Sequence, residues 1–334
     1  MQECTVKDKK ILMFGPNFFG YREAIAEQLR LMGAVVDLYD ERPNNGVFCK
    51  TMLRYRVPFY RPVVRKYYRT IVEENKDKQY DFVFVIKSEA IDRNIFEMMK
   101  QAFPKAKFVL YLWDSVQNVP NGEEKIRWYD RVLTFDPVDA KTYGLLHRPL
   151  FFRKEYEQAC PTESYEYDVA FVGTAHSIRP RVVKQIFSQC QQRGGRCFGY
   201  LFLPHPLVYV YNKICNPDYR DVKKSDLHFT PISAARILEV YNKSRSILDV
   251  EHSAQRGLTI RTIEMVGMQK KILTTNQLIK EYDFYHPNNI CVISKESPEV
   301  REEFLSAPYV PIASDVWDRY TLRAFVSDIL DGKE

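Results

Sequence analysis

The same order of short segments occurs twice in this 334-residue chain, and that repetition constrains its fold more than any other feature. Residues 10–15 form an apolar run ending in Gly15, and residues 168–173 form another ending in Gly173. After each run comes a polar loop, and then a segment with apolar residues at helical spacing. Strand, glycine, loop and helix in this order are typical of a doubly wound α/β sheet. We therefore predict two Rossmann-like, doubly wound domains that face a central cleft.

The predicted domain limits follow from where the pattern stops and restarts. Residues 1–150 contain four further apolar runs that suit buried strands and form the first domain. Residues 151–165 have no clear period and contain a proline, so they are predicted to be a linker. Residues 166–312 form the second domain, and residues 313–334 contain a last helix, expected at 317–330.

Composition excludes several classes of protein. Hydrophobic residues make up 45% of the chain, but no apolar run reaches the roughly 18 residues needed to span a bilayer. The seven cysteines are odd in number, widely spaced and without a CxxC pair, which argues against disulfides and zinc. The charged first ten residues do not resemble a signal peptide. We expect a cytoplasmic protein with reduced thiols, no bound metal and no cofactor.

The two glycine loops differ in chemistry. Gly15 and Gly20 are five residues apart and match neither a dinucleotide fingerprint nor a Walker loop, so Gly15, Asn17 and Phe18 suit the approach of a ligand. The second loop is small, polar and positively charged, and could hold a diphosphate through charge-assisted hydrogen bonds. Its residues are Gly173, Thr174, His176, Arg179 and Arg181. Because arginines in a first helical turn oppose the helix dipole, a function is favoured over simple solvation.

Residues 257–276 contain a second candidate for nucleotide binding. Gly257 ends a loop, Thr259 can cap a short helix at 259–267, and residues 271–275 suit a strand. Arg261 and Glu264 are three residues apart and share a helix face. One interpretation is a helix N-terminus that binds a diphosphate, with a carboxylate that accepts the hydroxyls of a ribose. The other is a surface helix with an ordinary ion pair.

Two further features allow more than one interpretation. Asp114 follows an apolar strand, where open parallel sheets bind ligands, so it is a candidate base; it could equally cap the next turn. Residues 54–69 contain six basic residues interleaved with tyrosine and phenylalanine. This pattern suits an anionic membrane surface, RNA, or a solvated helix face.

Several of these residues together resemble a known family. Residues 257–264, with Gly267 and residues 272–275, resemble the signature of CgeB-like glycosyltransferases, which are related to glycosyltransferase families 1 and 4 and have the GT-B fold. Residues 168–173 with the two arginines look like that family's first C-terminal strand and basic loop. Residues 112–115 look like its N-terminal strand exit.

The resemblance implies a nucleotide-sugar donor, as substrate, in the second domain. Glu264 would hold the ribose, and Glu251 would stand in for a second acidic residue. The acceptor would lie near Asn17, Phe18 and Asp114, no metal would be required, and the last helix would pack back toward the first domain. The residues expected to surround the donor are Gly173, Thr174, His176, Arg179, Arg181, Glu251, Gly257, Leu258, Thr259, Arg261 and Glu264.

These observations predict a glycosyltransferase of bacterial surface polysaccharide synthesis (capsule, lipopolysaccharide or exopolysaccharide). Its acceptor would be a glycan or a lipid-linked sugar at the inner face of the membrane, with residues 54–69 in contact with anionic lipid. Nucleic acid is not expected as a partner. Two alternatives remain open: a nucleotide-sugar epimerase of the same architecture, and a non-catalytic protein that binds RNA or a membrane.

Overall fold

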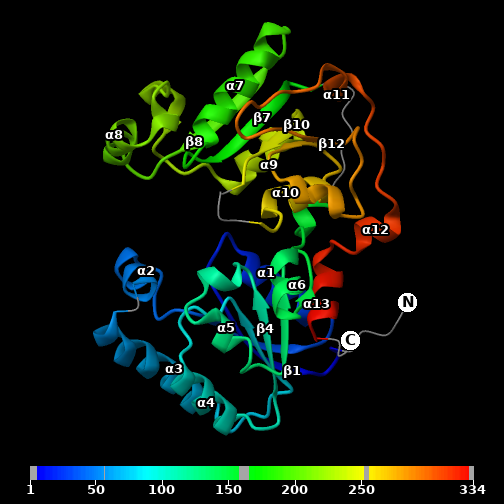
Figure 1. Cartoon of the computed structure of the whole chain (residues 1–334). Coiled ribbons are helices and arrows are strands. Elements are labelled where there is room, and N and C mark those ends of the chain that lie inside the picture. The colour runs from blue at the N-terminus through cyan, green and yellow to red at the C-terminus, as the bar shows by residue number, and fades with distance from the viewer. Residues whose placement is uncertain (1–5, 56, 158–164, 252–255, 331–334) are drawn as a thin grey trace. The chain divides into compact units, whose positions relative to one another are not determined.

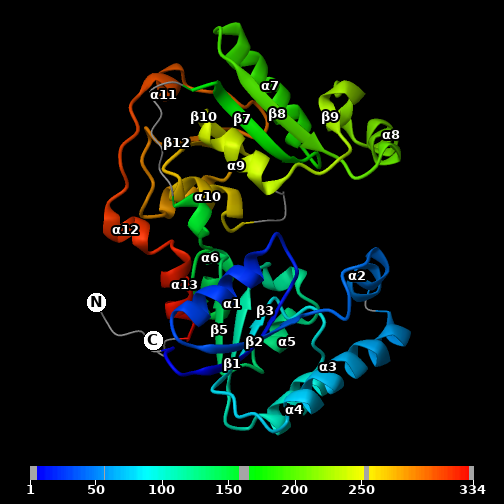
Figure 2. The same ribbon diagram turned by 180° about the vertical axis from the view of Figure 1, so that it is seen from behind.

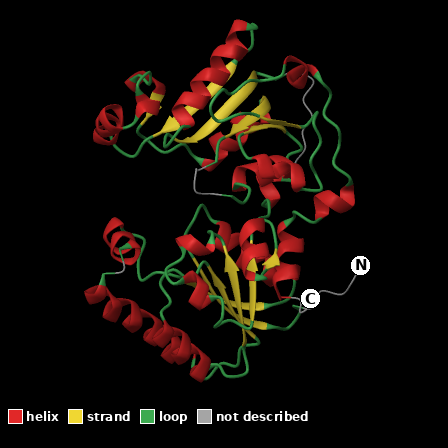
Figure 3. Ribbon diagram, in the orientation of Figure 1, coloured by secondary structure: helices red, strands yellow, loops and turns green. Residues whose placement is uncertain are grey.

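The chain forms two compact α/β units. The computed structural model describes residues 6–55, 57–157, 165–251 and 256–330 (Figures 1 and 2). The N-terminal unit consists of residues 1–149 and 322–334, and the C-terminal unit of residues 150–321. Each unit is built on a parallel six-stranded sheet with helices around it (Figure 3). The predicted class, with two Rossmann-like units, is confirmed, whereas the cleft between them stays a prediction.

The N-terminal sheet has the strand order β2-β1-β3-β4-β5-β6, and all neighbours are parallel. The strands are β1 Lys10–Gly15, β2 Val35–Asp40, β3 Phe82–Ile86, β4 Lys107–Leu112, β5 Arg131–Thr134 and β6 Leu146–His147. The α-helices are α1 Tyr21–Leu31, α2 Val47–Arg54, α3 Arg61–Asn75, α4 Arg93–Ala102, α5 Gly122–Lys125, α6 Pro137–Tyr143 and α13 Leu322–Leu330. The central strands are almost wholly apolar because helices cover both faces of the sheet.

Helix α13 belongs to the N-terminal unit although it comes at the end of the chain. The ring of Phe325 packs edge-on against Tyr111 of β4, with centroids 4.8 Å apart. The Arg148 guanidinium forms an ion pair with Asp328 at 2.8 Å. Apolar packing at one position and a charged contact one turn further along therefore hold α13 against the sheet.

The C-terminal sheet has the order β12-β11-β10-β7-β8-β9, again entirely parallel. The strands are β7 Tyr167–Thr174, β8 Cys197–Phe202, β9 Leu227–His228, β10 Ser244–Asp249, β11 Lys271–Thr274 and β12 Ile290–Val292. The α-helices are α7 Arg179–Gln192, α8 Pro206–Cys215, α9 Ala234–Asn242, α10 Ile260–Gly267, α11 Glu302–Ser306 and α12 Ser314–Asp318. Read from β9, the order is that of a Rossmann sheet, with β7 and β10 adjacent at its centre.

Helix α10 is buried along most of its length, which overturns the interpretation of residues 259–267 as a surface helix. Its residues from Thr262 to Gly267 are all buried. The predicted cap is confirmed, since the Thr259 side chain accepts a hydrogen bond from the Thr262 amide at 3.2 Å. At the other end, a Cβ on Gly267 would lie 2.5 Å from the ring of Phe152.

Two segments near the unit limits differ from the sequence-based expectation. The single helix expected at residues 317–330 is instead two helices, α12 and α13. A turn at Arg319 and Tyr320 separates them, and the carbonyl of Tyr320 accepts a hydrogen bond from the Phe152 amide at 3.0 Å. Phe151 and Phe152, which the sequence placed in a linker, are fully buried in the C-terminal unit. Residues 158–164 of that linker lie outside the described residues.

The contact between Gly267 and Phe152 predicts that Gly267→Ala destabilises the C-terminal unit by about 1–3 kcal/mol, the usual cost of overpacking. Alanine is otherwise the better helix former, so a loss of stability would oppose the intrinsic propensity. The measurement is urea unfolding of a double-mutant cycle with Phe152→Leu. Gly267→Ala should lower the free energy of unfolding by less in the Phe152→Leu variant than in the wild type. An equal loss of stability in the two proteins would contradict the steric explanation.

Candidate functional site

The centre of the C-terminal sheet is its topological switch point. The chain leaves β7 toward one side of the sheet and β10 toward the other, so their loops diverge and leave a crevice at the carboxyl edge. Ligands of open α/β sheets bind at this position. Gly173 and Thr174 end β7 here, and Asp249 ends β10. Sequence and topology thus point to the same edge.

A buried ion pair joins the elements around this switch point. Arg261 of α10 donates to the Asp249 carboxylate at 2.8 Å and to the carbonyl of Val172 on β7 at 2.5 Å. Its Nε donates to the Tyr241 hydroxyl at 3.3 Å. Burial by itself would lower the pKa of Arg261, but Tyr241 and Asp249 raise it above its ordinary value. Arg261 is therefore permanently charged and acts first as a link between α10 and two strands.

Asp249 also fixes the start of α10. Its second carboxylate oxygen accepts hydrogen bonds from the hydroxyls of Thr259 at 2.6 Å and Thr262 at 2.5 Å. Asp249 is fully buried, and these hydrogen bonds together with the Arg261 pair offset the cost of burying a carboxylate. Sequence reasoning missed Asp249, although its place at the end of an apolar strand is the same signal that singled out Asp114.

Gly173 is required by the position of Arg261. A Cβ on Gly173 would lie 2.9 Å from a terminal nitrogen of the Arg261 guanidinium, which is itself fixed by Asp249. The end of β7 therefore lies directly against Arg261 of α10. His176 lies in the same loop, half-buried, with Nδ1 3.2 Å from the Ser177 hydroxyl.

Arg179 and Arg181, which the sequence grouped together, point to different places. The Arg179 side chain donates to the carbonyl of Val250 at 2.7 Å, at the switch point. Burial and the nearby Arg261 lower its pKa. Arg181 instead binds Asp218 at 2.7 Å and the carbonyl of Lys295 at 2.9 Å. Arg179 therefore adds positive charge at the crevice, whereas Arg181 positions the segment after β12.

Glu251 lines a pocket of about 400 Å³ at the ends of β10 and β11. Its carboxylate is buried, forms an ion pair with Lys295 at 2.6 Å and accepts a hydrogen bond from Thr275. Arg256 and Asn276 also line this pocket, and the Asn276 amide donates to the carbonyl of Arg256 at 3.1 Å. Gly257 and Leu258, the next residues along the chain from Arg256, are buried. Lys295 was not foreseen, because it follows the last strand and belongs to no motif.

Glu264 is 7% exposed and lies among aromatic hydroxyls. Burial is the main reason that the pKa values of Tyr156 and Tyr241 are raised. The negative charge of Glu264 raises both pKa values further. Since Arg261 is engaged with Asp249, the ion pair that the spacing suggested is not the main link at this helix. The assignment of Glu264 to a ribose stays a prediction.

In the N-terminal unit the switch point lies between β1 and β3. Gly15 ends β1, and Asn17 and Phe18 in the following loop are exposed. The ring of Phe18 packs edge-on against Trp113, with centroids 6.3 Å apart. Asp114, next along the chain, has a half-exposed side chain and pairs with Lys87 at 2.8 Å. The loop after β1 and the exit of β4 therefore meet, and the role of these residues on the acceptor side stays a prediction.

A second carboxylate at this edge escaped sequence reasoning. Glu41 directly follows β2 and is fully buried. One of its oxygens accepts hydrogen bonds from the amides of Glu89 and Ala90, and the other has no hydrogen-bond partner among the described residues. Burial raises the pKa of Glu41 to about 7, although the positive charge of Lys87 opposes the change.

The described residues contain neither a cluster of side chains suited to a metal ion nor a helix suited to crossing a membrane. Within the ranges given above, no group of three or more His, Cys, Asp or Glu side chains is arranged to hold a metal ion. Of the helices in that part of the chain, none is both long and apolar enough to cross a membrane.

Comparison with known proteins is informative only at the level of structure. No protein-family model and no curated protein sequence matches the chain. Similar structures include OtsA (TM-score 0.62, 10% identity, 98% of this chain and 100% of that one). HepE of Anabaena in complex with UDP-glucose has a TM-score of 0.59 and 12% identity, over 96% of this chain and 98% of HepE. A glycosyltransferase from Rickettsia africae has a TM-score of 0.54 and 11% identity, over 97% of this chain and 94% of that one. At these identities the likeness establishes the fold, which is that of the GT-B glycosyltransferase structures.

The buried Glu41 predicts that the N-terminal unit loses stability as the pH rises. The pKa of Glu41 is about 7 in the folded protein and near 4.5 when unfolded, so the folded state binds the extra proton between these values. This protonation stabilises the folded state fully below pH 4.5, and the stabilisation is lost as the pH rises through 7. The free energy of unfolding falls by roughly 3 kcal/mol in total. Urea unfolding at pH 5 and pH 8 measures it.

Glu41→Gln should flatten this difference, because an amide resembles the protonated carboxyl and keeps the oxygen that accepts from the backbone. Glu123→Gln, on an exposed side chain of the same unit, is the matched control. A pH dependence that Glu41→Gln leaves unchanged would show that other groups cause it.

Proposed function

We propose that this protein is a glycosyltransferase that transfers a sugar from a nucleotide-sugar donor bound by the C-terminal unit. The observation that carries the proposal is the switch point between β7 and β10, where Arg179 and the start of α10 lie beside the pocket of Glu251 and Lys295. The GT-B fold supports it, and one similar structure, HepE, has UDP-glucose bound.

The chemistry would rest on stabilising the departing nucleoside diphosphate. As the bond from the sugar's anomeric carbon to the phosphate oxygen breaks, negative charge develops on the diphosphate. Arg179, Arg256 and Lys295 are cations at or beside the pocket and would meet that charge. With three cations available no metal ion is needed, so we propose metal-independent transfer to an acceptor hydroxyl. EDTA should then leave the transfer rate unchanged.

Asp114 is the proposed base. It would accept the proton from the acceptor hydroxyl as that oxygen attacks the anomeric carbon, which would give inversion of configuration. Its half-exposed side chain suits contact with an acceptor, and the pair with Lys87 holds the carboxylate in place. Phe18, 43% exposed, offers an apolar ring beside it.

The acceptor is proposed to be a glycan or lipid-linked sugar of bacterial surface polysaccharide, processed at an anionic membrane surface. Residues 47–70 contain seven basic residues and no acidic residue. In the same region five large apolar side chains are exposed: Val47, Phe48, Tyr55, Phe59 and Val63. Basic residues combined with exposed apolar side chains on short helices are typical of proteins that lie on a bilayer. We call residues 47–70 the basic surface segment.

The donor site predicts that nucleoside diphosphates raise the melting temperature and that Glu264→Ala reduces this rise. Loss of hydrogen bonds from a ribose to a charged carboxylate should weaken binding about 10- to 100-fold. Thermal shift against uridine, guanosine, adenosine and thymidine diphosphates measures it. Glu239→Ala, on the exposed side of α9, is the control. Equal affinities in the wild type and Glu264→Ala would refute the ribose assignment.

The basic surface segment predicts vesicle binding that depends on charge. Replacing Arg54, Lys66 and Arg69 with glutamine should weaken sedimentation with anionic vesicles roughly 100-fold, at about 1 kcal/mol for each cation. The same change at three exposed cations outside the segment should have little effect: Lys105, Arg127 and Lys141. If both triple variants bind vesicles like the wild type, the membrane contact is wrong.

A further inference from the structure

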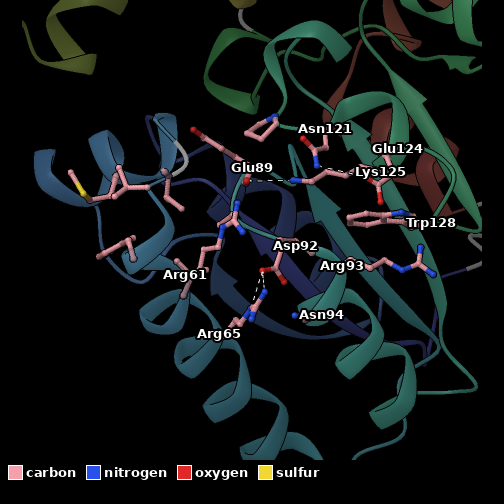
Figure 4. A pocket seen from close by; sticks show the side chains of 18 residues that line it. Arg61, Arg65, Glu89, Asp92, Arg93, Asn94, Asn121, Glu124, Lys125 and Trp128 are labelled. Atoms are coloured by element: carbon pink, nitrogen blue, oxygen red, sulfur yellow. Dashed lines mark hydrogen bonds and ion pairs between the residues drawn. The ribbon is translucent and has the colours of Figure 1, made fainter.

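The N-terminal unit contains a pocket that no sequence motif pointed to. It lies between α2 and α3 on one side and the start of α4 with α5 on the other, and its volume is about 330 Å³ (Figure 4). A pocket of this size can hold a sugar-sized group. Its two walls differ in chemistry, and that difference restricts what it can bind.

One wall is apolar and belongs to the basic surface segment. Met52, Leu53, Val57 and Val64 line it, and none of them is exposed. Phe48 of α2 is exposed, and its ring packs edge-on against Tyr60, which also lines the pocket. An apolar chain that lies against this wall would therefore be continuous with the surface proposed to contact the bilayer.

The opposite wall combines an aromatic ring with hydrogen-bonding side chains. Trp128 is half-buried and lies in Figure 4 beside Glu124, with Asn121 above it and Asn94 below. Amide and carboxylate groups can bind several hydroxyls at once, and the indole, which also contacts the Arg93 guanidinium 5.4 Å from its ring centroid, adds apolar surface. This combination suits a polyol or sugar ring better than a purely apolar ligand.

Arg61 adds a positive charge at the rim, between these two walls. It is exposed, and among the described residues no carboxylate forms an ion pair with it. By contrast, Arg65 one turn further along α3 is bound to Asp92 at 2.8 and 2.9 Å, and Arg93 is paired with Glu97. Arg61 is thus the cation of α3 at this pocket that is available to an anionic group.

We infer that this pocket binds the head group of an anionic glycolipid, with the chain against α2 and α3, the phosphate at Arg61 and the polyol beside Trp128. The identification of this ligand as the acceptor rests on the proposed function, whereas the binding itself does not. The pocket thereby assigns the acceptor to the class of phosphate-linked lipid sugars rather than free glycans.

The test is calorimetric titration of the full chain with three soluble probes below their micelle concentrations, without any donor. Lysophosphatidylinositol carries a polyol, a phosphate and one chain. Lysophosphatidic acid lacks the polyol, and inositol 1-phosphate lacks the chain. We expect lysophosphatidylinositol to bind at least about tenfold more tightly than either, since burial of a few methylene groups or a few hydroxyl contacts accounts for that factor.

Two matched pairs of variants locate the binding. Arg61→Gln and Glu124→Ala, both at the pocket, should each weaken binding of lysophosphatidylinositol about threefold to tenfold. Arg69→Gln on the same helix and Glu123→Ala on the same short helix should not, because neither residue lines the pocket.

Several outcomes would overturn the inference. Equal binding of lysophosphatidic acid, with Arg69→Gln as harmful as Arg61→Gln, would mean that lipid binds only the basic surface segment. Equal binding of inositol 1-phosphate would mean a site for soluble sugar phosphates. Because no donor is present, a protein without transferase activity that still shows the expected pattern would contradict the proposed function and leave the glycolipid site intact.

Discussion

The buried pair of Arg261 and Asp249 is the interaction on which the C-terminal unit depends. It joins α10 to β10, and through the carbonyl of Val172 it also joins α10 to β7. Removing one partner of such a pair typically costs about 3–5 kcal/mol, because the other charge is left buried and unpaired. The same pair requires a glycine at position 173 and sets the start of α10 through Thr259.

This arrangement separates structural from ligand-binding cations. Arg261 and Arg181 use their guanidinium groups to hold strands and loops together, although both seemed from sequence to face a diphosphate. Arg179 and Lys295 lie where an anion could approach, at the switch point and at the pocket of Glu251. Lys295 is far from the basic loop in the sequence, yet it belongs to the same candidate donor site.

The N-terminal unit combines a polar strand edge with an amphipathic surface. Asp114, Lys87 and the buried Glu41 lie at the carboxyl ends of β2 to β4, where the parallel sheet brings them together. The basic surface segment contributes apolar side chains both to the exterior and to the pocket beside Trp128. A single stretch of chain could thus serve the membrane and the acceptor, which is how a transferase would reach a substrate that stays in the bilayer.

The sequence by itself determined the α/β class, the two repeated units, the cap at Thr259 and the strand ends where polar residues gather. These are local properties, fixed by apolar periodicity and by side chains that bond to their own backbone. Only the tertiary structure decided that α10 is buried, that Arg261 pairs with Asp249 rather than chiefly with Glu264, and that Arg179 and Arg181 diverge. A guanidinium can reach many partners, and which one it binds depends on strands that meet only when the sheet has formed.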